Sequence, residues 1–407
     1  MRTRRPGQAS LFALLALPVM LGAVVLVLVF VRQRDTATEL RNAAVASALA
    51  AAGELADDAL LTDDPDRIRP VLERARAVAD GVGQRNLVEG KRLAIHPPKG
   101  DQPGDLLFGS HDPADGVDGQ FRPLPKDPTG HELGKLDAVR LTARHPFRGE
   151  CAFTRVTAIF DRHVCGFRPL PDRPAPLMPI ALYDGAHDTD RPAWGKAVAA
   201  GKDKWARADG QPVWVPGRDG LPEVVVRVGW QKEKGDGAVC GFPVRFGDAD
   251  RAGLLRQIAT GVSAADLHKH GGEVSLCDDK GKHAHGDPGW CDPREDDEDD
   301  HGKGKGKGKD DDEDGGDDDG DLPLGRFRQL ARTGEARVWP VFAAFDDDGR
   351  AVLVGFTAAR VVAAEREKGT GAVLLTLQPA VVATPTAVTR PDRPPYDRTV
   401  GRVRIGG

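Results

Sequence analysis

The sequence predicts an α+β protein with a single transmembrane helix at its amino end. A helical stalk continues this helix, and an extracytoplasmic region dominated by antiparallel strands follows. Apolar and helix-forming residues dominate the first 86 positions, whereas short apolar segments separated by Gly, Pro and Asp fill the rest. The 49 Gly and 31 Pro residues of the 407-residue chain are typical of many turns and short strands.

The strongest single feature is an apolar run from Ser10 to Val31. No charged residue lies between Arg5 and Arg32, and these 26 residues are enough to cross a bilayer core as a tilted helix. Backbone groups inside a bilayer must be paired, and a helix pairs them within one segment. We therefore expect residues 10–31 to form a single-pass transmembrane helix.

The charges that flank this run predict its orientation. Arg2, Arg4 and Arg5 precede it, and positively charged flanks stay in the cytoplasm. We expect residues 1–9 to be cytoplasmic and the bulk of the chain to be extracytoplasmic, anchored in the inner (cytoplasmic) membrane. A cleaved signal peptide is the main alternative, but its apolar region would be shorter and would end in small residues.

Residues 32–86 are predicted to form the helical stalk and a second helix. Thr36 to Leu61 is rich in Ala and has no Pro, so the anchor helix is expected to continue through it. Asp64 is a suitable N-cap and Pro65 a suitable first residue for the second helix. The apolar face of that helix recurs at spacings of three and four: Ile68, Val71, Leu72, Ala75, Val78, Ala79 and Val82.

Three later segments share one pattern: an apolar stretch, a polar turn, and a return stretch that contains a Gly-Phe pair. Each predicts a β-hairpin, with the glycine marking a bulge or a close backbone approach. The paired stretches are Val156–Phe160 with Val164–Phe167, Val224–Trp230 with Val239–Phe242, and Val338–Phe345 with Val352–Phe356.

The remaining organisation follows from composition. Residues 87–291 are expected to form a β-rich domain, and residues 322–407 its C-terminal part. Between them, residues 292–321 hold 16 acidic and 5 basic residues, a net charge of −11, and are expected to be a disordered low-complexity insertion. The net charge of the whole chain is −5, so the remainder carries +6 without an aromatic-interleaved basic patch, and no nucleic-acid partner is expected.

Five cysteines are present, so at least one thiol is left over from intramolecular pairing. Cys277 and Cys291 flank one turn-rich loop and are the disulfide candidate, although connectivity cannot be derived from sequence. Zinc is the alternative, because Cys and His suit it and gather in this region. The possible ligands are His268, His270, Cys277, His283, His285 and Cys291. Their spacing matches no standard zinc finger, so we expect no metal and no cofactor.

Motifs that would indicate catalysis are not found. The chain has no Gly-x-Ser-x-Gly nucleophile elbow, and the Gly-Lys alternation of residues 302–309 lacks the strand-to-helix frame of a phosphate loop. Cys165 and Cys240 occupy apolar strand positions, where we expect core residues or disulfide partners and not nucleophiles. A non-enzymatic protein is therefore expected.

Three ordered segments at the amino end carry a family resemblance: Arg4-Arg5-Pro6-Gly7-Gln8, Phe12-Ala13-Leu14-Leu15-Ala16-Leu17-Pro18-Val19, and Leu40-Arg41-Asn42-Ala43-Ala44-Val45-Ala46-Ser47-Ala48-Leu49-Ala50. Over about 50 residues the chain resembles TadG-like proteins of the Flp/Tad pilus-assembly system. Downstream stretches, including Asn86-Leu87-Val88-Glu89-Gly90 and Thr157-Ala158-Ile159-Phe160-Asp161, are similar to long TadG-like ectodomains. The resemblance implies a structural or assembly component of a pilus or secretion system, with other Flp/Tad proteins as partners.

One departure bears on assembly. Type IV pilins and TadE-like pseudopilins are cut after a Gly and keep a Glu five residues later. Here a cut after Gly7 would place Phe12 at that position, and the apolar run contains no acidic residue. The pattern therefore favours a permanent membrane anchor. Two other functions were weighed: an extracytoplasmic ligand-binding or sensory module of unrelated ancestry, and an anchored hydrolase.

Overall fold

The computed structural model describes most of the chain. The described residues are 6–99, 104–112, 120–147, 150–185, 192–208, 213–229, 238–247, 250–268, 271–276, 285–286, 322–345, 351–390 and 395–406. The predicted disordered insertion, residues 292–321, lies outside them.

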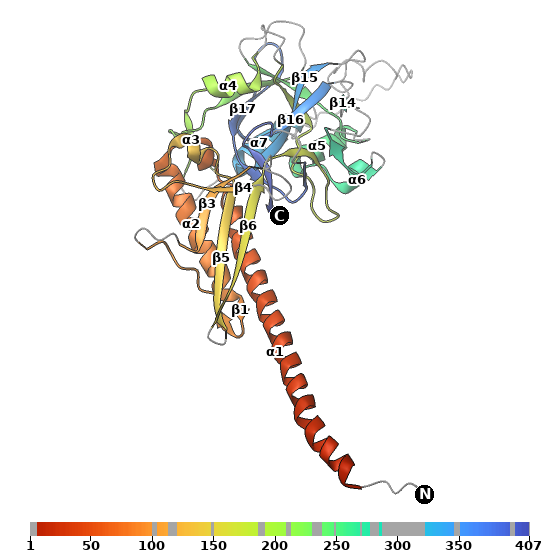
Figure 1. Ribbon diagram of the computed structural model, residues 1–407. Coiled ribbons are helices and arrows are strands. Elements are labelled where there is room, and N and C mark those ends of the chain that lie inside the picture. Colours follow the sequence, from red (N-terminus) through yellow and green to blue (C-terminus); the bar gives the residue numbers. More distant parts are fainter. Residues whose placement is uncertain are drawn as a thin grey trace, which may run out of the picture.

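A single helix, α1 (Pro6–Gly53), extends from the rest of the molecule like a rod (Figure 1). The side chains of residues 16–35 are almost all exposed, including large apolar ones such as Leu26 at 71 %. From Thr36 onward one face of the same helix is buried. Pro18 lies inside the helix, which continues past it. We call the described part of the chain from Thr36 onward the head. The predicted stalk is therefore the carboxyl half of α1, and it is packed inside the head.

The second predicted helix is also present as α2 (Pro65–Arg85). The Asp64 side chain caps it by accepting a hydrogen bond from the Asp66 backbone amide at 3.0 Å. Ile68, Val71, Ala75 and Ala79 are buried on the predicted face. A turn of 3₁₀ helix, η1 (Asp58–Leu61), joins α1 to α2, and the two helices pack against each other.

A six-stranded sheet covers the carboxyl half of α1. Its order is β18 (Val382–Ala383), β20 (Val400–Ile405), β6 (Glu150–Asp161), β5 (Ala138–Phe147), β3 (Leu106–Asp112) and β4 (Gln120–Pro123). All neighbours are antiparallel except β18 and β20. Because side chains alternate along each strand, one face packs on α1 and the other is largely polar. We call α1 from Thr36, α2 and this sheet the helix–sheet layer.

The second body of the head is a closed barrel. Around it run β16 (Ala351–Arg366), β15 (Ala336–Phe345), β8 (Ile180–Tyr183), β12 (Val239–Pro243), β11 (Val224–Val228) and β17 (Val373–Pro379), and β17 pairs with β16 to close the ring. Strands from both sides of the acidic segment, residues 292–321, therefore share one barrel. A short strand, β14 (His285–Gly286), pairs with β16 outside the ring.

The barrel interior is filled by side chains from all six strands. Val226, Trp339 and Leu377 are fully buried members of this cluster, and the alternate residue Val225 points outward. Helices α4 (Trp194–Ala200), α5 (Arg251–Thr260) and α7 (Leu322–Thr333) add side chains to the same cluster. The barrel is thus a packed core and not a pore.

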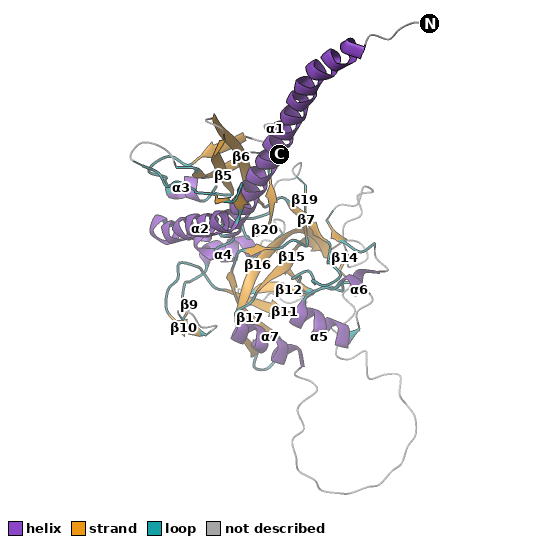
Figure 2. Ribbon diagram, turned by 90° about the horizontal axis from the view of Figure 1, so that it is seen from below, coloured by secondary structure: helices purple, strands orange, loops and turns teal. Residues whose placement is uncertain are grey.

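Smaller elements cover the outside of these two bodies, as Figure 2 shows. A three-stranded sheet consists of β13 (Val274–Ser275), β7 (Val164–Phe167) and β19 (Ala387–Thr389). Two strand pairs stand apart: β1 (Leu87–Val88) with β2 (Lys91–Arg92), and β9 (Trp205–Arg207) with β10 (Trp214–Pro216). Two single-turn helices complete the set: α3 (Gly130–Leu133) and α6 (Ala264–Leu267).

Of the three predicted hairpins, only the last is confirmed. β15 and β16 pair as an antiparallel hairpin. β6 and β7 belong to different sheets, because β7 pairs with β13 and β19 instead. β11 and β12 lie side by side but in parallel, so the residues between them cross over and do not form a tight turn.

The glycine of the third Gly-Phe pair does mark a close approach. A Cβ atom at Gly355 would lie only 2.3 Å from the ring of Tyr396. The Tyr396 hydroxyl donates a hydrogen bond to the Asp184 carboxylate, which also accepts the backbone amide of Gly195 at 3.0 Å. Gly355 therefore allows the segment before β20 to lie against the barrel.

Candidate functional site at the helix–barrel junction

The turn between α1 and α2 carries a run of acidic side chains at the place where the helix–sheet layer meets the barrel. Two of them serve the turn itself. Asp57 accepts the Ala59 backbone amide at 2.9 Å and so caps η1, and Asp64 caps α2 in the same way. Asp63 takes a left-handed backbone conformation, with φ of 51°, between them.

Asp58 connects this turn directly to the barrel. One carboxylate oxygen of Asp58 accepts the backbone amide of Val381 at 2.6 Å, and the other pairs with the guanidinium of Arg360 on β16. The Nε of Arg360 also donates to the Gly334 carbonyl at 3.1 Å. Asp58 and Arg360 are both largely shielded from water, so the pair is stronger than an exposed ion pair.

A second carboxylate extends the connection to the carboxyl end of the chain. Asp63 pairs with Arg398 at 2.6 Å, and Arg398 also lies 3.3 Å from the Gly134 carbonyl. Just beyond, the Thr399 hydroxyl accepts the Ala358 backbone amide of β16 at 2.8 Å. Strand β20 of the helix–sheet layer therefore begins directly after a residue that is hydrogen-bonded to β16 of the barrel.

The two helices are braced on the outer side of the same turn. Arg74 of α2 contacts Glu54 at 2.6 Å and Asp57 at 2.5 Å. The hydrogen bond to Glu54 raises the pKa of Arg74, so its positive charge is held firmly. These contacts link α2 to the residues that directly follow α1.

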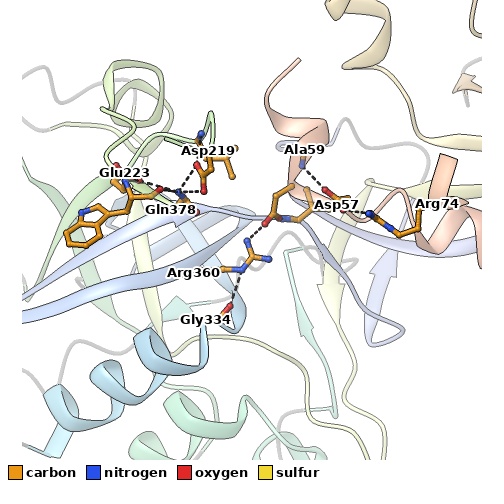
Figure 3. A network of polar contacts seen from close by, with 12 residues as sticks. Asp57, Ala59, Arg74, Asp219, Glu223, Gly334, Arg360 and Gln378 are labelled. Carbon is orange, nitrogen blue, oxygen red and sulfur yellow. Dashed lines mark hydrogen bonds and ion pairs between the residues drawn. The ribbon is translucent and has the colours of Figure 1, made fainter. Parts of the chain in front are cut away.

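A further set of hydrogen bonds surrounds Gln378 on β17, whose side chain is almost fully buried. Its amide nitrogen lies 3.2 Å from carboxylate oxygens of Asp219 and Glu223 and 3.3 Å from the Trp205 carbonyl (Figure 3). Burial raises the pKa of Asp219 and of Glu223, and the nearby charge of Asp203 adds to the effect. Gln378 thereby holds the loop that carries β9 and β10 over the barrel.

Buried ionisable groups line the inner side of the junction. Burial raises the pKa of Asp137 to about 7, although Arg162 and the His111 backbone amide act against this shift. Burial would also raise the pKa of Asp161, but hydrogen bonds from His163 and Arg404 outweigh it and hold that pKa well below its ordinary value.

The acidic side chains of this turn form structural contacts. Each of the four carboxylates of this turn accepts a backbone amide or a guanidinium group: Asp57, Asp58, Asp63 and Asp64. Their negative charges therefore hold segments of the chain together. Asp58 and Arg360 are 302 positions apart, and Asp63 and Arg398 are 335 apart. The junction therefore joins the amino-terminal helix to the last part of the chain.

A smaller polar cluster joins α1 to the head at the opposite end of the helix–sheet layer. Arg32 donates to Glu89 at 3.1 Å, and His145 of β5 lies 3.6 Å from the same carboxylate. Burial would raise the pKa of Glu89, but the hydrogen bond from Arg32 and its positive charge lower that pKa overall. Glu89 and Gly90 both have positive φ and form the two-residue turn between β1 and β2.

The residues predicted as a disulfide or zinc site are only partly described. Cys277, Cys291, His283 and His270 lie outside the described residues, and only the backbone of His285, in β14, is described. His268 is exposed and follows α6. Within the described ranges, no group of three or more His, Cys, Asp or Glu side chains could hold a metal ion. The disulfide remains a prediction.

The two strand cysteines are placed in separate sheets. Cys165 is buried in β7 with its sulfur 3.5 Å from the Val388 carbonyl, and Cys240 is half-buried in β12 with its sulfur 3.8 Å from the Gly229 carbonyl. These contacts fit side chains packed against the protein interior.

Sequence reasoning missed the junction residues. The cluster of Asp57, Asp58, Asp63 and Asp64 was visible as a local acidic turn, and this was the one signal available. Nothing in the sequence ties Asp58 to Arg360 or Asp63 to Arg398.

Comparison with protein-family models, curated proteins and solved structures finds no match for this chain. Among the described residues, one helix, Ala16–Gly53 within α1, is long and apolar enough to cross a membrane. A signal sequence near the amino end can pass the same test, so the assignment of α1 as an anchor also needs the structure around the helix.

Proposed function

We propose that the chain is a non-enzymatic, membrane-anchored protein of the cell envelope. Residues 10–31 would span the inner membrane, residues 1–9 would lie in the cytoplasm, and the head would be extracytoplasmic. The observation that carries this proposal is the continuity of α1, which passes without a break from an exposed apolar half into the core of the head. Such a helix holds the head at a short, fixed distance from the bilayer.

Within that class, a structural or assembly role like that of TadG-like proteins in a Flp/Tad pilus or secretion system fits best. The sequence resemblance at the amino end supports this role. The ion pairs of Asp58 and Asp63 support it too, because they join the turn after α1 to the rest of the head. The run between Arg5 and Arg32 has no acidic residue with which to pair inside a bundle of helices. This favours a permanent anchor over a polymerised subunit.

Gene context and deletion test this role together. Genes for a TadE-like pseudopilin and a secretion ATPase should flank this gene. Deleting it should abolish surface pili, and the full chain should restore them, whereas a chain without residues 10–31 should not. A Gly22→Leu variant, whose added side chain meets no atom within 4 Å at its Cβ position, is the matched control and should restore pili fully. Normal pili in the deletion strain would overturn the role.

A further inference from the structure

The head ends close to the bilayer, if α1 is the anchor proposed above. The apolar run stops at Val31, and Thr36 is already buried in the head with 2 % exposure. At about 1.5 Å per helical residue, these five positions span roughly 8 Å. The lower end of the head therefore lies at the depth of the lipid headgroups.

Two hairpins reach this level beside α1. Arg32, the first charged residue after the run, contacts Glu89 in the β1–β2 turn, and His145 of β5 contacts Glu89 from the other side. These contacts fix both hairpins at the height of Arg32. Figure 1 shows β1 and the distal part of the β5–β6 hairpin beside α1, where the helix leaves the head.

The side chains exposed there combine cations with large apolar groups. We call this set the membrane-proximal rim; it consists of Arg34, Leu87, Lys91, Arg92, Arg144 and Phe153, all exposed. Phe153 is 72 % exposed and Leu87 55 %, although both are large and apolar. Phe153 lies directly opposite Arg144 in the β5–β6 register, so a cation and an aromatic ring share one outward face.

Acidic groups near the rim are mostly engaged within the protein. Glu89 is bound by Arg32, and Glu39 accepts the backbone amide of Glu89 at 2.9 Å. Asp35 is exposed on α1 beside Arg34. Four cations thus face outward, against the exposed carboxylates of Asp35 and Glu39, and Glu39 already accepts the Glu89 backbone amide.

We propose that the membrane-proximal rim binds anionic phospholipid headgroups around the anchor, so that the head rests on the membrane at a fixed angle. Cations next to exposed Phe and Leu form the combination that binds an anionic bilayer surface, because the cations meet phosphates and the apolar groups enter the interface. The rim is continuous with the spanning helix, so a lipid surface is the partner already within reach.

The test uses the full chain in liposomes of phosphatidylcholine alone or mixed with phosphatidylglycerol. Cys151 is exposed on β6 near the hairpin end, so a fluorophore on it, with the other cysteines replaced, reports on the rim. A label at Val225→Cys on the outer face of β11 is the matched control. With phosphatidylglycerol, we expect the Cys151 label to be quenched by lipid-borne quencher and protected from iodide, and the control label to stay open to iodide.

Lys91→Glu together with Arg92→Glu should abolish the phosphatidylglycerol effect, and Phe153→Ser should weaken it. A Cys151 label that is as open to iodide as the control in both lipids would overturn the rim proposal, as would full retention of the effect in the double variant. Alkaline extraction separates this result from failure of the anchor. A chain that resists extraction while its rim stays in water refutes the rim alone, and a chain that is extracted refutes the anchor.

Discussion

The two halves of α1 differ in charge, in residue size and in surroundings. The amino half exposes Leu, Val and Phe side chains, such as Leu17 at 63 % and Val19 at 71 %. The carboxyl half buries small residues, among them Ala44, Ser47 and Ala48, each with 0 % exposure. Small side chains let α1 lie close to α2 and the sheet, whereas nothing among the described residues covers the large ones.

This difference explains why one helix serves two environments. Each buried apolar Å² contributes about 25 cal/mol, so a row of exposed Leu and Val is costly in water and favourable in lipid. The alanine-rich half needs a protein partner because it relies on close packing. Side-chain volume and charge therefore both separate the halves, because the carboxyl half carries Glu39 and Arg41 and the amino half carries no charge up to Val31.

The largest expected effect comes from adding volume to the buried half. Ala48→Leu places a large side chain where α1 contacts the sheet and α2, and we expect a loss of roughly 3 kcal/mol in the free energy of unfolding. Gly22→Leu adds volume to the exposed half and should change nothing. Denaturant unfolding in detergent, followed by near-UV circular dichroism, measures both. Equal tolerance at the two positions would remove the distinction between the halves.

The next effect tests how the buried half is attached to the barrel. Arg360→Ala leaves the Asp58 carboxylate without its guanidinium partner and should cost about 2 kcal/mol of stability. Arg69→Ala is the matched control, since it removes an ion pair to Asp66 in which the side chains are 68 % and 86 % exposed. That control should cost under about 0.5 kcal/mol. Similar losses for both would mean that the junction contributes no more than a surface pair.

A smaller effect should appear in the pH dependence of the helix–sheet layer. Burial raises the pKa of Asp137 to about 7, so the folded chain keeps this proton in the pH range where the unfolded chain has lost it. Between about pH 4 and pH 7 the native state binds more protons, and this group's contribution to stability falls as pH rises. Asp137→Asn should remove that slope, so the variant gains stability relative to the wild type from pH 4 to pH 7.

Thermal unfolding of both proteins across this range measures the difference. The pKa of Asp161 is lowered, so that group loses its stabilising contribution only at lower pH and cancels in the comparison. A constant difference between variant and wild type from pH 4 to pH 7 would contradict the assignment to Asp137.

The smallest effect is expected outside both halves. Residues 292–321 have almost no apolar side chains to bury, so replacing them with a short Gly/Ser linker should leave the unfolding midpoint unchanged. The measurement is a thermal melt of the shortened chain beside the full chain. A large drop would show that the acidic segment stabilises the head.

The predictable parts of the fold are those whose signal is local. The period of Ile68, Val71, Ala75 and Ala79 predicted α2, and the Asp64-Pro65 pair predicted its start, since capping and amphipathic spacing act within a few residues. The β15–β16 hairpin was predictable for the same reason.

The remaining parts depend on contacts between distant residues. The parallel pairing of β11 with β12 is set by β8 and β17 on either side, and no turn signal announces it. The junction pairs are more than 300 positions apart, so Asp58 and Arg360 look like ordinary surface charges in the sequence. Only the assembled barrel brings them together.

The central claim is that the exposed half of α1 spans a membrane and holds the head outside the cytoplasm. The most direct test is alkaline extraction of native membranes, followed by protease added to right-side-out vesicles. We expect the full-length chain to stay in the membrane pellet and its carboxyl end to be digested. Release of a shortened chain that begins near residue 32, or full protection of the carboxyl end, would contradict the account.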